Sequence, residues 1–467
     1  MAIKDLSLKA IREQIMSGMR DVTFKTDDGA TTEMVYIPRF TVPAGAYDGG
    51  AFPAEALNLG GFFIDKYQCS KQTGDNANIP VSLPGRIPWA NINQTEAKTA
   101  CAARLINGVA CHLPTMEEWA TICFLTKLLG HDIHGNNNYG KDYRDSAAWG
   151  NYGVPDKTCE GRVLTGTGPV SWSCDGTSKG VFDIVGNVWE WLDFDIADGV
   201  YTHKKTALIN DSDGITAVDK TITLDNVEDI DAWPATGLIQ IGDEYITYGA
   251  IDKQTATTAV LSSCTRGAKD STAAAHADNV TVYQLTDYCV IPGGATAYLT
   301  AEISASAASF AYDGLLNGPD NNGFAVGDTL QMGTEQALVT AVESNTLTVT
   351  RGVNGTTAIT HASGSAFTKI PPQMNNADPA GDAYQYAKIN TMRLESDLAP
   401  LALPKAVGNG TEEWKDGFWI RSKGSRAAIR GGSWYNGGNA RSGFYLTLSY
   451  APGHRNAAVG FRAALSI

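Results

Sequence analysis

An internal repeat sets the first limit on how this chain folds. Four separate blocks recur with the same offset of 85 residues. The pairs are Gly242-Asp243 and Gly327-Asp328, Thr265-Arg266-Gly267 and Thr350-Arg351-Gly352, Thr272-Ala273 and Thr357-Ala358, and His276 and His361. A constant offset over four blocks indicates two copies of one folding unit. Runs such as 238–248 and 346–350 predict strands, so we expect two small β modules.

The repeated arginine and histidine have two interpretations. They could carry chemistry, or they could be a capping or hydrogen-bonding pair that each module needs to close its fold, next to a turn glycine. We favour the second interpretation.

The tryptophans show where the repeat lies in the chain. Of ten tryptophans, only Trp233 falls between residues 205 and 370, and three more follow residue 385. The repeat therefore reads as an insertion into one parent domain, at a surface loop whose ends lie close together. The expected organisation is an N-terminal helical segment at 1–30, a first part of the parent domain at 31–204, β modules at 205–290 and 291–372, and a second part at 373–467.

Charge and composition exclude several classes of protein. The 36 basic and 50 acidic residues give a net charge of −14, which argues against nucleic acid as a partner. No apolar run is long enough to cross a membrane, and the N-terminus lacks the pattern of a secretory signal. A surface role would then require another export route, such as assembly into a virus particle. The 49 glycines and 18% charged residues favour a loop-rich or β-rich protein.

Local patterns predict a few helices and strands. Residues 3–19 fit an amphipathic helix, either packed on its own domain or serving oligomerisation or attachment. Residues 60–67 read as a strand opened by a glycine turn. Helices are expected to start after Thr95 and Thr115, each acting as N-cap ahead of glutamates. Cysteine spacing leaves open whether Cys159 and Cys174, which flank a loop, form a disulfide.

Five ordered blocks resemble a known family. They are Gly61-Phe-Phe-Ile-Asp-Lys-Tyr67, Leu113-Pro-Thr-Met-Glu-Glu-Trp119, Gly186-Asn-Val-Trp-Glu-Trp191, Arg430-Gly-Gly-Ser-Trp434 and Gly460-Phe-Arg462. The blocks are similar to those of the formylglycine-generating-enzyme, or sulfatase-modifying-factor, type of C-type lectin fold. The resemblance implies an α+β fold class, interrupted here by two small all-β repeat modules.

The family's oxidase activity is not expected in this chain. Family members that oxidise a substrate cysteine use paired cysteines just after the Arg-Gly-Gly-Ser block, and here no cysteine follows Cys289. That thiol chemistry has no residues to act through, so we expect no catalytic residues and no enzyme.

Residues 430–467 resemble the variable region of a second branch of the fold, the variable proteins of diversity-generating retroelements. In those systems a reverse transcriptase alters template adenines, so codons of the asparagine type become hypervariable. Phe444, Leu446 and Leu448 alternate with polar or tyrosine residues, which predicts one core face and one open face. Tyrosines among Ser, Gly and Asn are also typical of binding surfaces. The expected ligand-binding, variable residues are Tyr435, Asn436, Asn439, Tyr445, Thr447, Ser449, Tyr450, His454, Asn456, Ala457 and Ala458. The alternative is a surface strand with no special role.

The resemblance also implies a calcium ion near the Gly186–Trp191 block. Asp183 and Glu190, with the carbonyls of Gly186 and Val188, would suit an oxygen-preferring cation. The alternative is that Glu190 makes buried hydrogen bonds and no ion is present. The motif His131-Asp-Ile-His134 is a weaker metal candidate, because it reads as a loop and no third ligand has recognisable spacing.

The expected function is a receptor-binding or adhesion protein that presents a hypervariable surface to a host-surface protein or glycan. A virion surface, such as a tail or fibre, is the expected location, and self-association is left open. The alternatives are a formylglycine-generating-type oxidase and an invariant viral decoration protein.

Overall fold

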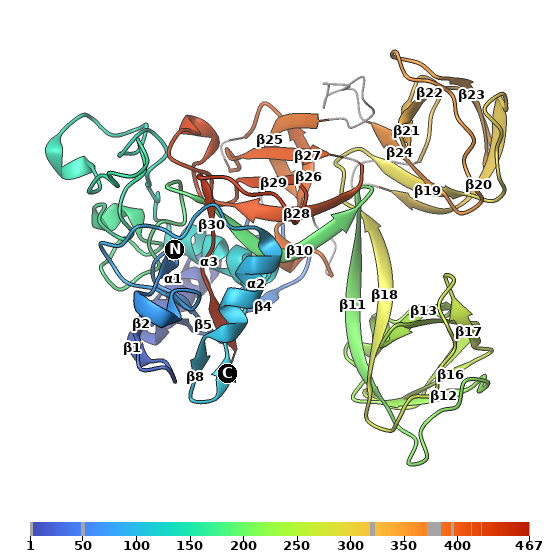
Figure 1. Cartoon of the computed structure of the whole chain (residues 1–467), viewed down its shortest axis with the longest axis horizontal. Coiled ribbons are helices and arrows are strands. Elements are labelled where there is room, and N and C mark those ends of the chain that lie inside the picture. Colours follow the sequence, from blue (N-terminus) through green and yellow to red (C-terminus); the bar gives the residue numbers. More distant parts are fainter. Residues whose placement is uncertain are drawn as a thin grey trace. The chain divides into compact units, whose positions relative to one another are not determined.

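Strands dominate the structure. The computed structural model describes residues 3–47, 52–317, 323–370, 384–393, 397–411, 413–421 and 423–466. It assigns 40% of the chain to strands and 12% to helices, and it contains a six-stranded barrel and a large sheet (Figure 1). The predicted α+β C-type lectin class is therefore wrong, and the chain is mainly β. Helical periodicity is confined to short segments, and glycine turns separate strands over the rest of the sequence.

Helices are short within the described part of the chain. The α-helices there are α1 (Ile3–Gly18), α2 (Gln94–Ala103) and α3 (Met116–Leu129), and the 3-10 turns are η2 (Gly74–Asn76), η3 (Trp149–Asn151), η4 (Val170–Trp172), η5 (Ile230–Ala232), η7 (Ala399–Leu401) and η8 (Gly437–Asn439). Thr115 caps α3 as predicted, and its hydroxyl accepts from the Glu118 N–H at 3.1 Å. The predicted cap at Thr95 is wrong, because Asn93 caps α2 and forms a reciprocal pair with Glu96.

Two sheets build the parent domain, and both join distant parts of the sequence. The larger has the order β10-β28-β29-β27-β25-β26, with β30 pairing with β10, and the smaller has the order β1-β2-β5-β31. The strands are β1 (Arg20–Lys25), β2 (Thr31–Ile37), β5 (Phe62–Asp65), β10 (Trp189–Ala197), β25 (Tyr384–Met392), β26 (Pro404–Gly408), β27 (Gly417–Arg421), β28 (Ser425–Arg430), β29 (Leu446–Tyr450), β30 (Val459–Gly460) and β31 (Ala464–Ser466). Three two-stranded ribbons complete the domain, β3 (Phe40–Val42) with β4 (Leu57–Leu59), β6 (Ser70–Lys71) with β7 (Pro80–Val81), and β8 (Leu105–Ile106) with β9 (Val109–Ala110).

Aromatic side chains and buried ion pairs hold this domain together. Trp119 and Trp191 are fully buried, and the Trp119 indole N–H donates to the Gly443 carbonyl at 2.9 Å. The guanidinium of Arg462 bonds both carboxylate oxygens of Glu190 at 2.6 Å, and all of these atoms are inaccessible to solvent. Removing one partner of such a pair would leave a buried charge uncompensated.

Residues Val200–Tyr288 form a separate compact unit with its own core. Its strands are β11 (Val200–Ile209), β12 (Ile222–Asp225), β13 (Gly237–Ile241), β14 (Glu244–Tyr248), β15 (Ala250–Lys253), β16 (Ala259–Ser262), β17 (Thr265–Ala268) and β18 (Thr281–Cys289). β11 pairs with β18 and with β12, and β12 pairs with β16. β14 and β15 together form one bent arm of a hairpin, and they pair with β17 and β16 respectively in the other arm. β14 also pairs with β13, which pairs with β18. The pairings therefore close into a ring, which we call the first barrel.

Residues 295–370 form a closed barrel with its own core, which we call the second barrel. Its strands are β19 (Ala295–Leu299), β20 (Ser309–Asn317), β21 (Thr329–Met332), β22 (Glu335–Glu343), β23 (Thr346–Arg351) and β24 (Ala366–Ile370), in the order β19-β20-β23-β22-β21-β24 (Figure 1). The first barrel has the same order, with β11, β12, β16/β17, β14/β15, β13 and β18 in the corresponding places.

A buried glutamate joins the repeated residues of each barrel. The Glu244 carboxylate accepts from Arg266 Nη2 at 2.7 Å, lies 2.8 Å from His276 Nε2, and accepts from the Gly267 N–H at 3.1 Å. Glu335 makes the corresponding contacts with Arg351 at 2.6 Å, His361 at 3.0 Å and the Gly352 N–H at 3.2 Å. The repeated arginine and histidine thus belong to a hydrogen-bonding network within each barrel.

The structure changes one detail of the repeat. The predicted strand 238–248 is a hairpin, because Gly242 turns the chain between β13 and β14 with a φ of 57°. Its counterpart is Gly333 in the hairpin of β21 and β22, with a φ of 58°, and not Gly327. The carbonyls of Gly242 and Gly333 accept from the Gln240 and Gln331 side chains respectively.

The ends of the first inserted segment meet in the parent domain. The Val290 N–H donates to the Gly199 carbonyl at 2.9 Å. A segment with adjacent ends can be added to a domain without separating the strands around it.

Candidate ligand-binding surface

The predicted variable residues fall mainly on two loops of the parent domain. The first loop covers residues 435–442 and contains η8, and the second loop covers residues 450–457, starting at the last residue of β29. Tyr435 is 49% exposed, and Arg455, Asn456 and Ala457 are also exposed. These two loops are the candidate surface.

Side chains from elsewhere in the parent domain hold the backbone of the first loop. Asn137 donates from Nδ2 to the Ala440 carbonyl at 2.8 Å, and its own carbonyl accepts from the Gly437 N–H at 2.8 Å. Asp416 accepts from the N–H of Arg441 at 2.7 Å and from the Ser442 hydroxyl. The path of the loop therefore depends on residues outside it.

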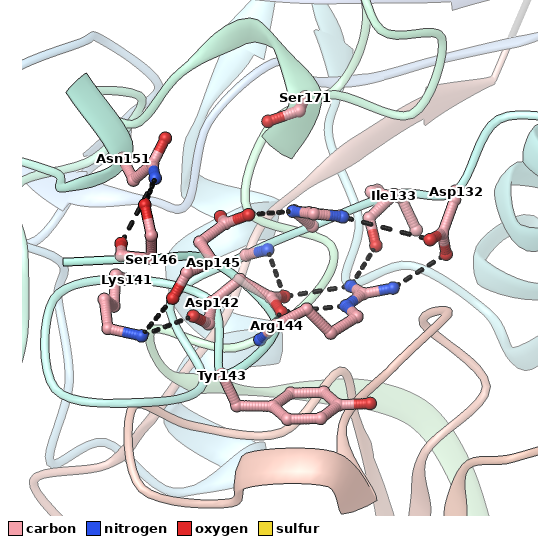
Figure 2. A network of polar contacts seen from close by, with 12 residues as sticks. Asp132, Ile133, Lys141, Asp142, Tyr143, Arg144, Asp145, Ser146, Asn151 and Ser171 are labelled. Atoms are coloured by element: carbon pink, nitrogen blue, oxygen red, sulfur yellow. Dashed lines mark hydrogen bonds and ion pairs between the residues drawn. The ribbon is translucent and has the colours of Figure 1, made fainter. Parts of the chain in front are cut away.

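A buried polar network supports Asn137. The Asp142 carboxylate has no solvent access and accepts from Asn137 Nδ2 at 3.0 Å, from Arg144 Nε at 2.8 Å and from the Gly135 N–H at 3.0 Å. Burial raises the pKa of Asp142, but the hydrogen bonds from Arg144 outweigh it and leave that pKa below its ordinary value. Arg144 continues the network to Asp132 at 2.7 Å, as Figure 2 shows.

The second loop is held in the same manner. The Asn91 N–H donates to the Asn456 carbonyl at 3.0 Å, and Arg162 Nη1 donates to the Ala457 carbonyl at 3.0 Å. Arg162 is itself fixed by Asp156, at 2.6 Å. These contacts use the backbone carbonyls of Asn456 and Ala457, and not their side chains.

Aromatic side chains gather around the two loops. Tyr435 packs edge-on against Trp434 with ring centroids 5.5 Å apart, and Tyr450 stacks on His454 at 4.1 Å. Burial raises the pKa of Tyr450, and the neighbouring Tyr435 raises it further. Burial lowers the pKa of His454, which favours the neutral form of its ring.

The predicted open face over 444–449 is wrong. Tyr445 is 1% exposed, and Thr447, Ser449 and Ala458 are also buried. β29 lies between β27 and β28 in the sheet, and aromatic rings pack against Tyr445 just before it. The Tyr445 ring lies 4.4 Å from that of Trp189, and its hydroxyl accepts from Trp419 Nε1 at 2.6 Å.

Three predicted variable asparagines have structural contacts. Asn436 Oδ1 accepts from the Ser433 N–H at 2.7 Å, and Asn456 Oδ1 accepts from the Ala458 N–H at 2.8 Å. Asn439 Oδ1 accepts from the Tyr386 hydroxyl at 2.7 Å. Replacing any of these amides would change the loop as well as the surface.

Two exposed aromatic residues of the parent domain were not predicted from the sequence. Tyr139 is 59% exposed with a φ of 47°, and its N–H donates to the Trp434 carbonyl at 2.7 Å. Trp149 is 93% exposed in η3, and both residues line a pocket of about 640 Å³. Aromatic residues in a Gly- and Asn-rich segment were the signal, because such a segment offers little core to bury them. A bulky residue at positive φ is uncommon and is found most often where a site constrains the backbone.

The predicted calcium ligands do not form a cation site. Asp183 and Glu190 are both buried, but Arg462 occupies both oxygens of Glu190 and Gln68 donates to one of them at 2.9 Å. Asp183 Oδ2 accepts from the Gly166 N–H at 2.8 Å, while its Oδ1 is buried without a hydrogen-bond partner among the described residues. One free carboxylate oxygen is too few for calcium, which takes six to eight oxygen ligands.

The histidine motif and the cysteines serve no metal site in the described ranges. His134 Nδ1 pairs with Asp145 at 2.9 Å, and no group of three or more His, Cys, Asp or Glu side chains there could hold a metal ion. All eight cysteines are free, including Cys159 and Cys174, so the disulfide alternative is not realised.

Comparison with family models finds none that matches this chain, and comparison with curated proteins finds no matching protein either. Across the described residues, every helix is too short or too polar to cross a membrane.

Proposed function

We propose that this protein is a ligand-binding protein whose first and second loops form a recognition surface diversified by a retroelement. The expected ligand is a protein or glycan on a host surface, and the expected location is a virion. Exposed tyrosines supply contact area at low cost in side-chain entropy, which suits this role.

One observation carries the proposal: groups outside the two loops hold a large part of the backbone of both. Asn137 and Asp416 hold the first loop, and Asn91 and Arg162 hold the second. Side chains such as Tyr435 and Ala457 can therefore be exchanged without changing the path of the chain. A surface that varies from copy to copy requires this separation of framework from contact residues.

The oxidase alternative has little support. Burial raises the pKa of Cys69, Cys101 and Cys289 above that of an ordinary thiol, which disfavours the reactive thiolate. Cys159 is partly exposed but has no second cysteine bonded to it.

The test is to sequence the region around the gene. A reverse transcriptase and a near-copy of the gene's 3′ end should lie close by. Differences between the copies should fall at template adenines, and they should encode positions on the two loops. An absent second copy, or differences spread evenly over the gene, would contradict the diversification and leave an invariant decoration protein as the better explanation.

A further inference from the structure

A pocket of about 650 Å³ opens on the parent domain next to the second loop. The lining consists of the end of β6, the segment 85–91, and Thr158, Cys159, Arg162 and Ala457. The Trp89 N–H donates to the Cys69 carbonyl at 2.7 Å, so its wall is tied to the core of the domain. The volume suits a ligand of one or two sugar rings, since small-molecule sites span about 300–1,000 Å³.

The pocket carries positive charge in an acidic protein. Lys71 and Arg86 line it and are exposed, and neither forms an ion pair within the described part of the chain. Among the described residues, no carboxylate lines the pocket. The third cation, Arg162, is neutralised by Asp156 and acts as a fixed wall. Two cations without an ion-pair partner, in a pocket lined by no carboxylate, favour an anionic group.

An aromatic ring and polar groups complete the site. The Lys71 ammonium lies 4.7 Å from the centre of the Trp89 ring, which packs against Phe461 at 5.4 Å. A partly exposed tryptophan in a polar pocket offers an apolar surface to a sugar ring. Asn91 adds an amide that can hydrogen-bond to sugar hydroxyls.

One buried group in the wall is unsatisfied. Ser70 is 2% exposed and lines the pocket, and its hydroxyl has no hydrogen-bond partner among the described residues. Buried hydroxyls are nearly always paired in folded proteins, with protein or with a bound molecule. A ligand oxygen in the pocket would supply the missing partner.

We propose that this pocket binds an acidic saccharide, a sugar that carries a carboxylate or a sulfate. Lys71 and Arg86 hold the acid group, the Trp89 ring supports the sugar ring, and Ser70 bonds a ring substituent. This site goes beyond the function proposed above, because only Ala457 belongs to the two loops. Its charged and aromatic groups, Lys71, Arg86 and Trp89, would be the same in every variant of those loops.

Calorimetric titration of the purified full chain tests the inference. The probes are a uronate-containing disaccharide, a sulfated disaccharide, a neutral disaccharide and inorganic sulfate. Wild-type protein should bind at least one acidic disaccharide about tenfold or more tightly than the neutral one, which is the usual size of a charge-assisted contact. Lys71→Ala and Arg86→Ala should each weaken that binding about tenfold. The preferred acidic disaccharide identifies the acid group.

The matched control is the double variant Lys179→Ala/Lys220→Ala, which removes two exposed lysines that do not line the pocket. It should bind as wild type does, whereas Lys71→Ala/Arg86→Ala should lose binding while unfolding at the same temperature. Tyr435→Ala should also bind normally, which separates this site from the loop surface. Equal loss in both double variants, equal affinity for neutral and acidic sugars, or sulfate alone binding as tightly would overturn the inference.

Discussion

Neighbouring residues of the first loop have different roles. Tyr435 projects into solvent, whereas Asn436 turns inward and accepts two hydrogen bonds from Ser433, at 2.7 and 2.9 Å. Both residues fit the sequence pattern of a variable position. Only the contacts of each side chain separate a residue that can vary freely from one that shapes the loop.

A matched pair of substitutions tests this distinction. Asn436→Ala should destabilise the parent domain by about 1–2 kcal/mol, because the Ser433 donors lose their acceptor. Tyr435→Ala should change stability by less than about 0.5 kcal/mol, as is usual at exposed sites. Urea unfolding followed by tryptophan fluorescence reports on the parent domain, since nine of the ten tryptophans lie outside the first barrel. Equal effects of the two substitutions would contradict the assignment.

Asp183 should make the parent domain sensitive to pH. Burial raises its pKa from 3.8 to about 6, so the folded state holds its proton more tightly than the unfolded state does. Stability is therefore expected to fall as pH rises from 3.8 through about 6. Asp183→Asn keeps an acceptor for Gly166 and removes this fall. Urea unfolding at about pH 4 and about pH 7 should show a smaller change for the variant than for wild type.

The same measurement checks the metal assignment. Because Glu190 is occupied by Arg462, added calcium should leave the unfolding midpoint of wild-type protein unchanged. A midpoint raised by calcium in wild type and not in Asp183→Asn would show that the two carboxylates bind the ion after all.

At the level of elements, helix starts could be predicted from residues close together in the sequence. The burial of side chains next to a strand could not, because the residues that bury them are distant in the sequence. The start of α3 follows from Thr115 and Glu118, three residues apart. Asn93 and Glu96 have the same spacing, so the cap of α2 is also visible in the sequence, two residues before the expected Thr95. The burial of Tyr445 is different, because Trp189 and Trp419, which contact it, are distant from it in sequence.

The cap assignment can be tested directly. Asn93→Ala should destabilise the parent domain by about 1 kcal/mol, because the Glu96 N–H loses its acceptor. Thr95→Ala removes an exposed hydroxyl inside the helix and should have little effect. Urea unfolding of both variants, compared with wild type, measures the difference. A larger loss at Thr95 than at Asn93 would mean that the helix begins where the sequence pattern first placed it.

For the whole molecule, the repeat and the positions of the tryptophans indicated how the chain is divided into units. The constant offset of Arg266 and Arg351 predicted a pair of β modules, and each segment has a closed ring of strands and its own core. The boundaries proposed from sequence remain predictions. Sequence analysis missed Glu244 and Glu335, because their offset differs from that of the arginines they bind.

The first barrel should fold in isolation. Residues 200–288 expressed alone should unfold cooperatively by circular dichroism, because the unit contains its own core and a closed ring of strands.

Glu244→Gln should lower the free energy of unfolding of this barrel by about 3–5 kcal/mol, since Arg266 would remain without its buried partner. Arg266 and His276 hold the pKa of Glu244 at about 2 despite burial, so stability should fall as pH drops from 4.5 towards 2. A fragment without a cooperative transition, or a variant with wild-type stability, would contradict this account.

The glutamate network also identifies a place where foreign sequence can be grafted. Glu244 and Arg266 are 22 residues apart, whereas Glu335 and Arg351 are 16 apart, yet the two networks have the same geometry. The hairpin between glutamate and arginine therefore changes length without disturbing the barrel. Its tip in the first barrel, at residues 254–257, is exposed. An epitope or affinity tag inserted there would be displayed by a folded barrel, far along the chain from both loops of the recognition surface.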